Sequence, residues 1–218
     1  MLSRKSDVAD VRINIPAAHE APIFISICYN NLMTSLKSQI QSYIPYDQRE
    51  TNDKSVILQC LDTFPDTLTR ENRICHFTAS DWIINPDRSK ALMIHHNIQR
   101  QWMWPGGHAD GKDNLLQVAL REAHEETGLT HIRTLSPEIF SLEIFTVPAH
   151  IRRGQLVNAH LHLNCSFLFE ATEQDTIHIK PDENNGIRWI TFTEIIKNVD
   201  AGKMSPHYCK LIEKCSKY

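Results

Sequence analysis

Residues 107–129 read GHADGKDNLLQVALREAHEETGL, and this stretch decides how the surrounding chain is expected to fold. A glycine turn leads into a proline-free run of helix-forming residues that ends at Gly128, where a left-handed stop is expected. Asp113 or Asn114 is placed to cap the start of this helix. At about 100° per residue, one face of the helix carries Leu116, Ala119, Leu120, Ala123 and Thr127. The stretch therefore predicts a helix with one face buried.

Three glutamates, Glu122, Glu125 and Glu126, fall together on a neighbouring face of this predicted helix. Like charges at such a spacing repel each other and destabilise a helix. A bound divalent cation removes that cost, because hard cations take carboxylate oxygens as ligands. Glutamate pairs at the same spacing also occur on solvated helix faces. By themselves, the three residues leave a metal site and a solvent-exposed acidic face equally open.

The complete spacing resembles the signature of the Nudix hydrolase family. Gly107 is followed after five residues by Asp113, and after seven more by the run REAHEETGL at residues 121–129. The family pattern has glutamate where this chain has Asp113, and every other fixed position of the pattern is matched. The preceding WPGG at residues 104–107 extends the similarity upstream.

The resemblance implies a hydrolase that uses Mg²⁺ or Mn²⁺ to cleave the diphosphate of a nucleoside diphosphate linked to another group. Such a reaction needs cations that bridge phosphate oxygens and hold the attacking water. The family pattern assigns Glu122 and Glu126 as primary metal ligands, with Glu125 close behind and the Gly106 carbonyl as a further ligand. Arg121 is expected to pair with these acids and orient them, so Arg121 and Glu125 are candidate catalytic residues.

The sequence leaves two points of the expected site undecided: the role of Asp113 and the identity of the general base. Asp113 is one methylene shorter than glutamate, so it either holds a metal through water or only supports the loop. In several relatives a glutamate outside the signature helps to activate water, and the best candidate by position is Glu183. Asp182 is its rival, and a solvated loop carboxylate is an equal alternative for either residue.

Candidate substrate contacts lie on both sides of the helix in the sequence. His108 follows the glycines and could touch a phosphate. Arg152 and Arg153 lie in a predicted exposed loop at 148–158 and could clamp a substrate phosphate. The alternatives are a hydrogen-bonded structural histidine and a plain solvated loop.

Other histidines also call for interpretation, since the chain has twelve. His160 and His162 share one face of a predicted strand, and together with His76 they could form a polar cleft wall. His95 and His96 are neighbours on a strand and therefore point to opposite faces. For each of them, a structural role is the simpler interpretation.

Hydrophobic periodicity predicts strands on both sides of the central helix and further helices toward both ends of the chain. Strands are expected near 72–85, 90–96, 101–104, 132–147, 159–171 and 186–190, and helices near 23–44, 54–64, 191–199 and 205–218. This order predicts an α/β fold with a mixed sheet between helical layers. It agrees with the Nudix-type α/β/α sandwich that the resemblance implies. We expect a mostly helical N-terminal extension over 1–70 and the Nudix hydrolase domain over 71–218.

Composition bounds the partners and the compartment. The 218 residues carry a formal net charge of −3, so no general basic field predicts a nucleic-acid partner. No apolar run approaches the roughly 18 residues of a membrane span, and the first residues lack the apolar core of a signal peptide. The six cysteines form no C-x-x-C motif, which favours free thiols in a reducing cytoplasm. A small-molecule nucleotide or diphosphate substrate is expected, without nucleic acid or membrane, and a homodimer is left open.

Two other functions compete with the hydrolase. A Nudix-fold binding or regulatory module would sense a nucleotide without turning it over, and only Asp113 favours that interpretation. An isopentenyl diphosphate isomerase shares the fold but needs a cysteine-bearing strand motif, which the surroundings of Cys75 do not provide.

Overall fold

The computed structural model describes residues 35–152, 154–198 and 204–218, all of which belong to one compact unit, Met33–Tyr218. The helices are α1 (Leu36–Ser42), α2 (Gln48–Thr63), α3 (Leu115–Thr127), α4 (Phe192–Asn198) and α5 (Ser205–Cys215). The first strands are β1 (Cys75–Ile84), β2 (Lys90–His96), β3 (Trp102–Met103), β4 (Gly106–His108) and β5 (Arg133–Thr134). The others are β6 (Ser141–Val147), β7 (His150–Arg152), β8 (Gln155–Val157), β9 (His160–Glu170) and β10 (Asn184–Thr191). Residues 23–34 of the first predicted helix lie outside the described chain.

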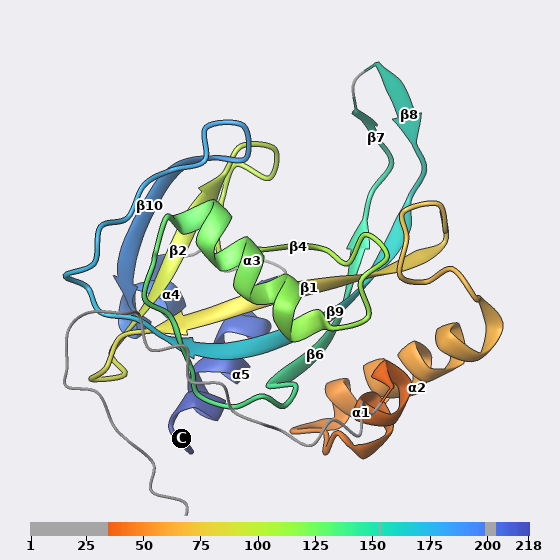
Figure 1. Ribbon diagram of the computed structural model, residues 1–218, viewed down its shortest axis with the longest axis horizontal. Coiled ribbons are helices and arrows are strands. Elements are labelled where there is room, and N and C mark those ends of the chain that lie inside the picture. The colour runs from red at the N-terminus through yellow and green to blue at the C-terminus, as the bar shows by residue number, and fades with distance from the viewer. Residues whose placement is uncertain (1–34, 153, 199–203) are drawn as a thin grey trace, which may run out of the picture. The chain divides into compact units, whose positions relative to one another are not determined.

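A mixed sheet forms the centre of the fold (Figure 1). Its strand order is β10-β2-β1-β9-β5, while β3 pairs with β2, β4 with β1, and β6 with β9. Strands β1 and β9 run parallel from Cys75↔Leu161 to Ile84↔Glu170, and the other pairings are antiparallel. Parallel neighbours need a long crossover, and here that connection contains α3. The predicted mixed sheet is confirmed.

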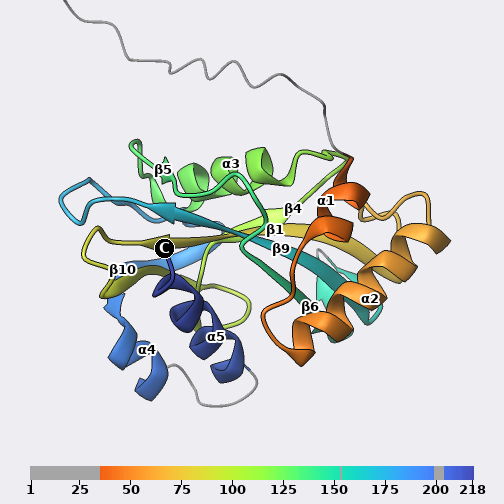
Figure 2. The ribbon, with the colours of Figure 1, turned by 90° about the horizontal axis from the view of Figure 1, so that it is seen from below.

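Helices cover both faces of this sheet (Figure 2), with α3 on one side and α4 and α5 on the other. Alternation along β1 supplies both contacts, since successive strand residues point to opposite faces. Phe77 and Ala79 join the apolar cluster that includes the buried face of α3. Trp82 and Ile84 join a second cluster with Tyr208 of α5. The α/β/α sandwich expected from the sequence is therefore confirmed.

Helices α1 and α2 pack at one end of the sheet (Figure 2) and share its core. Ile40 and Ile57 are both fully buried in the cluster on the α3 side. Helix α2 begins at Gln48, so the polar connection predicted at 46–52 is wrong from that residue onward. The Asp47 side chain accepts the Glu50 N–H at 2.8 Å and caps a polar first turn, which carries no apolar period.

Two further short elements differ from the sequence-based expectation. The predicted glycine turn contains strand β4, which pairs with β1 through Ser80↔Gly106, Ala79↔Gly107 and Thr78↔His108. The predicted loop at 148–158 contains the β7–β8 hairpin, which projects from the sheet in Figure 1. Strands of three residues are too short to show a period of two, which explains both errors.

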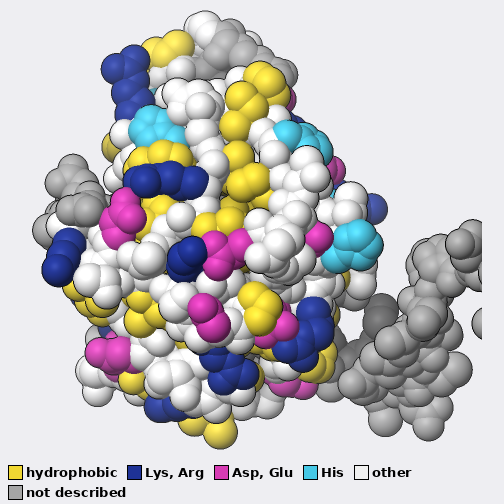
Figure 3. Space-filling view, turned by 90° about the vertical axis from the view of Figure 1, so that its left-hand side faces the viewer, with side chains coloured by type: hydrophobic (Ala, Val, Ile, Leu, Met, Phe, Trp, Pro, Cys, Tyr) yellow, Lys and Arg dark blue, Asp and Glu magenta, His cyan; other side chains and the backbone are white. Residues whose placement is uncertain are grey.

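The described surface is mixed in charge. On the face in Figure 3, basic and acidic side chains alternate with apolar and neutral ones. Of the helices in the described chain, none combines the length and apolar character needed to cross a bilayer.

Candidate active site

Helix α3 carries the three glutamates, and its ends hold it in place beside β4. The Asn114 side chain accepts the Gln117 N–H at 3.2 Å, so Asn114 rather than Asp113 is the cap. Gly128 ends the helix in the left-handed conformation, with φ of 74°, as the sequence predicts. Between these ends, Ala123 is fully buried in the apolar core, and this packing holds the acidic turns of α3 against β4.

The Glu122 carboxylate lies directly against Gly107. A Cβ added at Gly107 would lie 2.9 Å from Oε2 of Glu122 and closer still to the rest of that carboxylate. Only a glycine therefore leaves room for the acid at this position. Arg121 Nη2 contacts Glu122 Oε1 at 2.9 Å, and its Nη1 lies 3.5 Å from Glu125. The structure thus places Arg121 between two of the acids that it is expected to orient.

Glu126 is held by the preceding glycine. The Gly106 N–H donates to Glu126 Oε2 at 2.8 Å, and the carboxylate is 2% exposed. Gly106 has φ of 155°, and a Cβ there would lie 2.7 Å from the Ala79 carbonyl oxygen. The Asn184 side chain donates to the Glu126 carbonyl at 3.0 Å, which fixes this turn of α3 to the start of β10. Gly106 and Asn184 therefore define the position of Glu126.

Burial and mutual repulsion shift both buried acids toward their protonated forms. Burial, together with the neighbouring Glu183 and Glu122, raises the pKa of Glu126 to about 8 against the Gly106 hydrogen bond. Burial also raises the pKa of Glu122, which Arg121 lowers and Glu125 raises again. The metal-free site therefore retains a proton at neutral pH, and a divalent cation would relieve the repulsion that keeps it there.

Asp81 is a third buried acid beside these two, and the sequence reasoning did not single it out. It lies on β1, fully buried, and within the described chain neither carboxyl oxygen has a hydrogen-bond partner. Burial, followed by the charges of Glu126 and Glu122, holds the pKa of Asp81 well above its usual range. The signal in the sequence is an acid at a position that shares its strand face with Ala79 and Ile83.

An outer rim of charges surrounds the buried pair. Glu125 is exposed, and the Lys180 ammonium lies 3.1 Å from Glu125 Oε2 and 3.1 Å from Glu183 Oε1. Glu183 comes from the segment before β10 and also forms a side-chain hydrogen bond with Glu126. Its acidic neighbours raise the pKa of Lys180 against the effect of burial. Lys180 has no recognisable signal in the sequence, because its partners are brought to it only by the fold.

Comparison with known proteins decides the family. The model of the NUDIX domain matches residues 76–211, which is more than half of the chain. The chain belongs to the Nudix family. It is 27% identical over 141 residues to a probable DHNTP pyrophosphohydrolase of Lactococcus lactis subsp. cremoris, covering 64% of this chain and 80% of that protein.

Two further similarities complete the comparison. The chain is 34% identical over 127 residues to the m7GpppN-mRNA hydrolase NUDT17 of Xenopus laevis, covering 56% of this chain but only 40% of that protein. Among solved structures, a NUDIX-family hydrolase from Clostridium perfringens has 18% identity and a TM-score of 0.47. That match covers 65% of this chain and 97% of the bacterial one.

Not every expected site residue of this Nudix chain lies at the glutamates. Asp113 is exposed in the loop before α3, and its carboxylate makes no hydrogen bond or ion pair with another described residue. Asp182 is likewise exposed. Arg152 belongs to β7, and Arg153 lies outside the described residues. His108 lies on β4 with its ring against His76 and His162.

The donor set fits the hard cation that the Nudix signature implies. Glu122 and Glu126 offer carboxylate oxygens from one rigid helix, and the missing Cβ of Gly107 leaves the space that Glu122 occupies. The Asp81 carboxyl next to them has no hydrogen-bond partner among the described residues and is a further oxygen donor that the protein alone leaves unsatisfied. Mg²⁺ and Mn²⁺ take oxygen ligands of this kind and keep several waters or substrate oxygens.

Proposed function

We propose that this Nudix chain is a Mg²⁺- or Mn²⁺-dependent pyrophosphohydrolase. Its substrate class would be a nucleoside diphosphate linked to another group, or a related nucleotide. The observation that carries the proposal is the pair of buried carboxylates, Glu122 and Glu126, packed against Gly106 and Gly107. Family membership supports it, since both curated relatives are named as hydrolases of phosphate-containing compounds.

Each residue at the glutamates would have a separate task. Glu122 and Glu126 would hold the cation, with Glu125, the Gly106 carbonyl and, through water, Asp113 as further ligands. The bound cation would neutralise the diphosphate and lower the pKa of the attacking water. Arg121 and the Gly106 N–H orient the two carboxylates before any substrate arrives, which lowers the cost of organising the site.

Glu183 is the proposed general base. Its carboxylate lies beside Glu126 and 3.1 Å from the Lys180 ammonium, and a carboxylate at this position would accept a proton from the attacking water. Asp182 has no comparable position, because it is exposed beside the site. Arg152, in β7, and Arg153 remain proposed phosphate contacts.

A substrate screen tests the proposal. The wild-type protein is assayed with Mg²⁺ and Mn²⁺ against dinucleotides, nucleotide sugars, CDP-alcohols and nucleoside triphosphates, scored by released phosphate or nucleoside monophosphate. We expect Glu122→Gln and Glu126→Gln to lower kcat by at least about 100-fold without loss of fold. Glu138→Gln, an exposed acid in the loop before β6, is the matched control.

The outcomes separate the competing functions. Wild-type turnover that survives in both variants would refute the proposed metal ligands. Nucleotide binding without turnover of any substrate, even at saturating Mn²⁺, would instead support the binding or regulatory module.

A further inference from the structure

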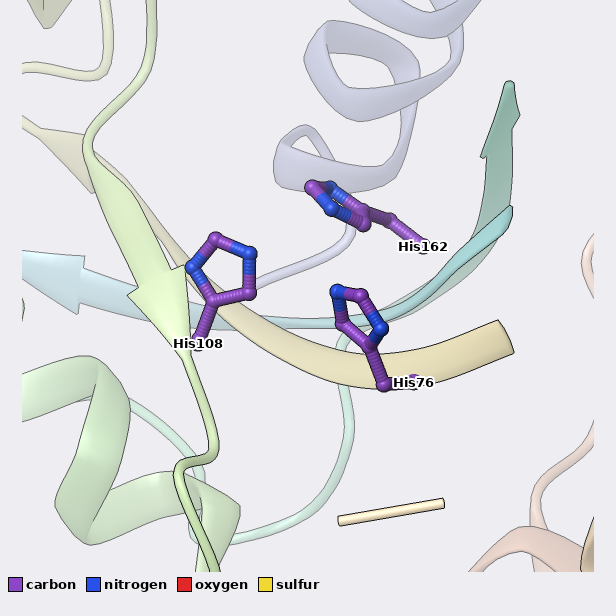
Figure 4. Close-up of side chains that lie close together, drawn as sticks. All are labelled: His76, His108 and His162. Atoms are coloured by element: carbon purple, nitrogen blue, oxygen red, sulfur yellow. The ribbon is translucent and has the colours of Figure 1, made fainter. Parts of the chain in front are cut away.

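Strand pairing brings four histidines together on the face of the sheet opposite α3. His76 of β1 is opposite His162 of β9, and His108 of β4 is opposite Thr78, two residues from His76. Residues two apart on a strand share a face, so His160 joins the same group. Figure 4 shows three of the rings pointing toward one another from three different strands.

The nitrogens of these rings are close enough to share one ion. One ring nitrogen from each of His76, His108 and His162 lies within 4.8 Å of the other two. His160 Nε2 lies 3.2 Å from His162 Nε2. In a tetrahedral site with bonds of 2.0–2.1 Å, ligand nitrogens are roughly 3.4 Å apart, so small side-chain rotations suffice.

His76 provides the independent observation that indicates a ligand. It is 4% exposed, and its Nδ1 lies 3.0 Å from the Asn72 carbonyl oxygen. A carbonyl only accepts, so Nδ1 carries the proton and Nε2 presents a lone pair. Within the described chain this buried Nε2 has no hydrogen-bond partner. A buried polar atom without a hydrogen-bond partner destabilises the folded state, and a purely structural role for His76 does not explain why this nitrogen is left unpaired.

His160 is oriented in the same way. Its Nδ1 lies 2.8 Å from the Asn158 carbonyl oxygen, so its Nε2 is also the unprotonated nitrogen and faces His162. Metal-binding histidines usually donate the other ring N–H to a backbone carbonyl or a carboxylate, which fixes the tautomer. Two of the four rings therefore already have that second hydrogen bond.

The electrostatics favour the neutral rings that bind metals. Burial, then the neighbouring His108, His76 and His160, lower the pKa of His162 to about 2. Burial also lowers the pKa of His76. At His76 and His162, a proton therefore does not compete strongly with a metal ion at neutral pH.

We propose that His76, His108 and His162, with His160 as a fourth ligand, bind a divalent transition metal of the Zn²⁺ class. Imidazole suits Zn²⁺, Co²⁺ or Ni²⁺, whereas carboxylates suit Mg²⁺ and Mn²⁺. The ion would join β4 to β1 and β9, immediately beyond the glycines that position Glu122 and Glu126. His108 and His162 are only partly buried, which leaves solvent a route to the nitrogens.

Cobalt binding by the full chain tests this site independently of hydrolysis. Chelator-treated protein is titrated with Co²⁺ in excess Mg²⁺, and visible d–d absorption reports nitrogen ligation. We expect about one strongly bound Co²⁺ per chain and displacement of it by Zn²⁺. His76→Gln and His162→Gln should each weaken Co²⁺ binding by more than about 100-fold, because even the loss of an outer hydrogen bond commonly costs 10–100-fold.

Two controls keep the result interpretable. His131→Gln changes a histidine whose side chain is 84% exposed and should bind Co²⁺ as the wild type does. Glu126→Gln should also retain the Co²⁺ absorption, which separates this site from the glutamates. Circular dichroism confirms the fold of each variant. Wild-type Co²⁺ affinity in folded His76→Gln and His162→Gln, or loss of the absorption in Glu126→Gln alone, would overturn the proposal.

Discussion

Substitution of Gly107 by alanine is the most direct probe of the glutamate site. The backbone tolerates the change, because Gly107 is not among the residues with positive φ. The new methyl group, however, would lie 2.9 Å from Oε2 of Glu122 and nearer to its other carboxylate atoms, where ordinary contact begins at 3.4 Å. The carboxylate must therefore move by about 1 Å, because closer approach is strongly repulsive.

The size of the expected effect follows from that displacement. Misplacing a catalytic group by about 1 Å can cost on the order of 100-fold in rate, which corresponds to about 2.7 kcal/mol of transition-state stabilisation. Stability should change little, because the methyl group pushes against a side chain and not against the apolar face of α3. A change within about 1 kcal/mol in the free energy of unfolding is expected.

Two measurements check the prediction for Gly107→Ala. Mn²⁺ affinity is followed by the electron paramagnetic resonance signal of free Mn²⁺, which needs no substrate, and kcat is measured on whichever substrate the screen identifies. Gly186→Ala is the matched control, since its methyl group would meet Trp102 at 3.1 Å and His95 at 3.3 Å, away from the acids. Wild-type Mn²⁺ affinity and kcat in Gly107→Ala would refute the role assigned to Glu122.

Three further predictions concern protonation and stability. The Glu126 pKa of about 8 in metal-free protein means that Mn²⁺ must displace a proton to bind. The Mn²⁺ affinity, measured by the same titration, should therefore rise about tenfold per pH unit below pH 8 and level off above it. An affinity that does not change with pH would contradict this prediction. The Glu50 pKa, held at about 2 by Lys210 and Lys214 against burial, lies below its ordinary value of 4.5, so its contribution is present above pH 4.5 and is lost as the pH falls toward 2. This contribution to the free energy of unfolding is at most about 3 kcal/mol, and the burial of Lys214, whose own pKa is lowered, reduces it. In Glu50→Gln, the free energy of unfolding should therefore depend less steeply on pH in the acid range, as measured by circular dichroism. Ile57→Ala should cost about 2–5 kcal/mol in one cooperative denaturant transition, whereas a separate early transition would show that α2 unfolds independently.

The sequence predicts α3 closely because every signal for it is local. Its cap and its left-handed end at Gly128 follow from neighbours within a few residues along the chain. Its buried face is predicted in part, since Ala119, Ala123 and Thr127 are buried but Leu116 and Leu120 are only half-buried. The strands β1 and β9 are long enough for alternation to show, and β2 is a compact apolar run after a turn, so their positions could also be predicted. The family signature then identifies the acids on α3 without any knowledge of the sheet.

Residues that join the acids from elsewhere could not be predicted, because their proximity depends on strand pairing. In the sequence, Asp81 is a single acid within an apolar strand, and only the packing of α3 on β1 shows that it lies beside Glu122 and Glu126. Lys180 reads as a loop lysine until the turn before β10 brings it to Glu125. Such contacts join residues far apart in the sequence, for which a single chain contains no period or spacing.

Strand β4 places His108, a predicted phosphate contact, on the opposite side of the strand from the glutamates. His108 directly follows the glycines in the sequence, which is why the sequence predicts that it could touch a phosphate. On a strand, however, neighbours point to opposite faces, and here Gly107 meets Glu122 while the His108 ring meets His76 and His162. Carboxylate donors thus collect on one side of β4 and imidazole donors on the other. Because the two donor types prefer different metals, the geometry of this short strand favours two ions of different chemistry over one shared site.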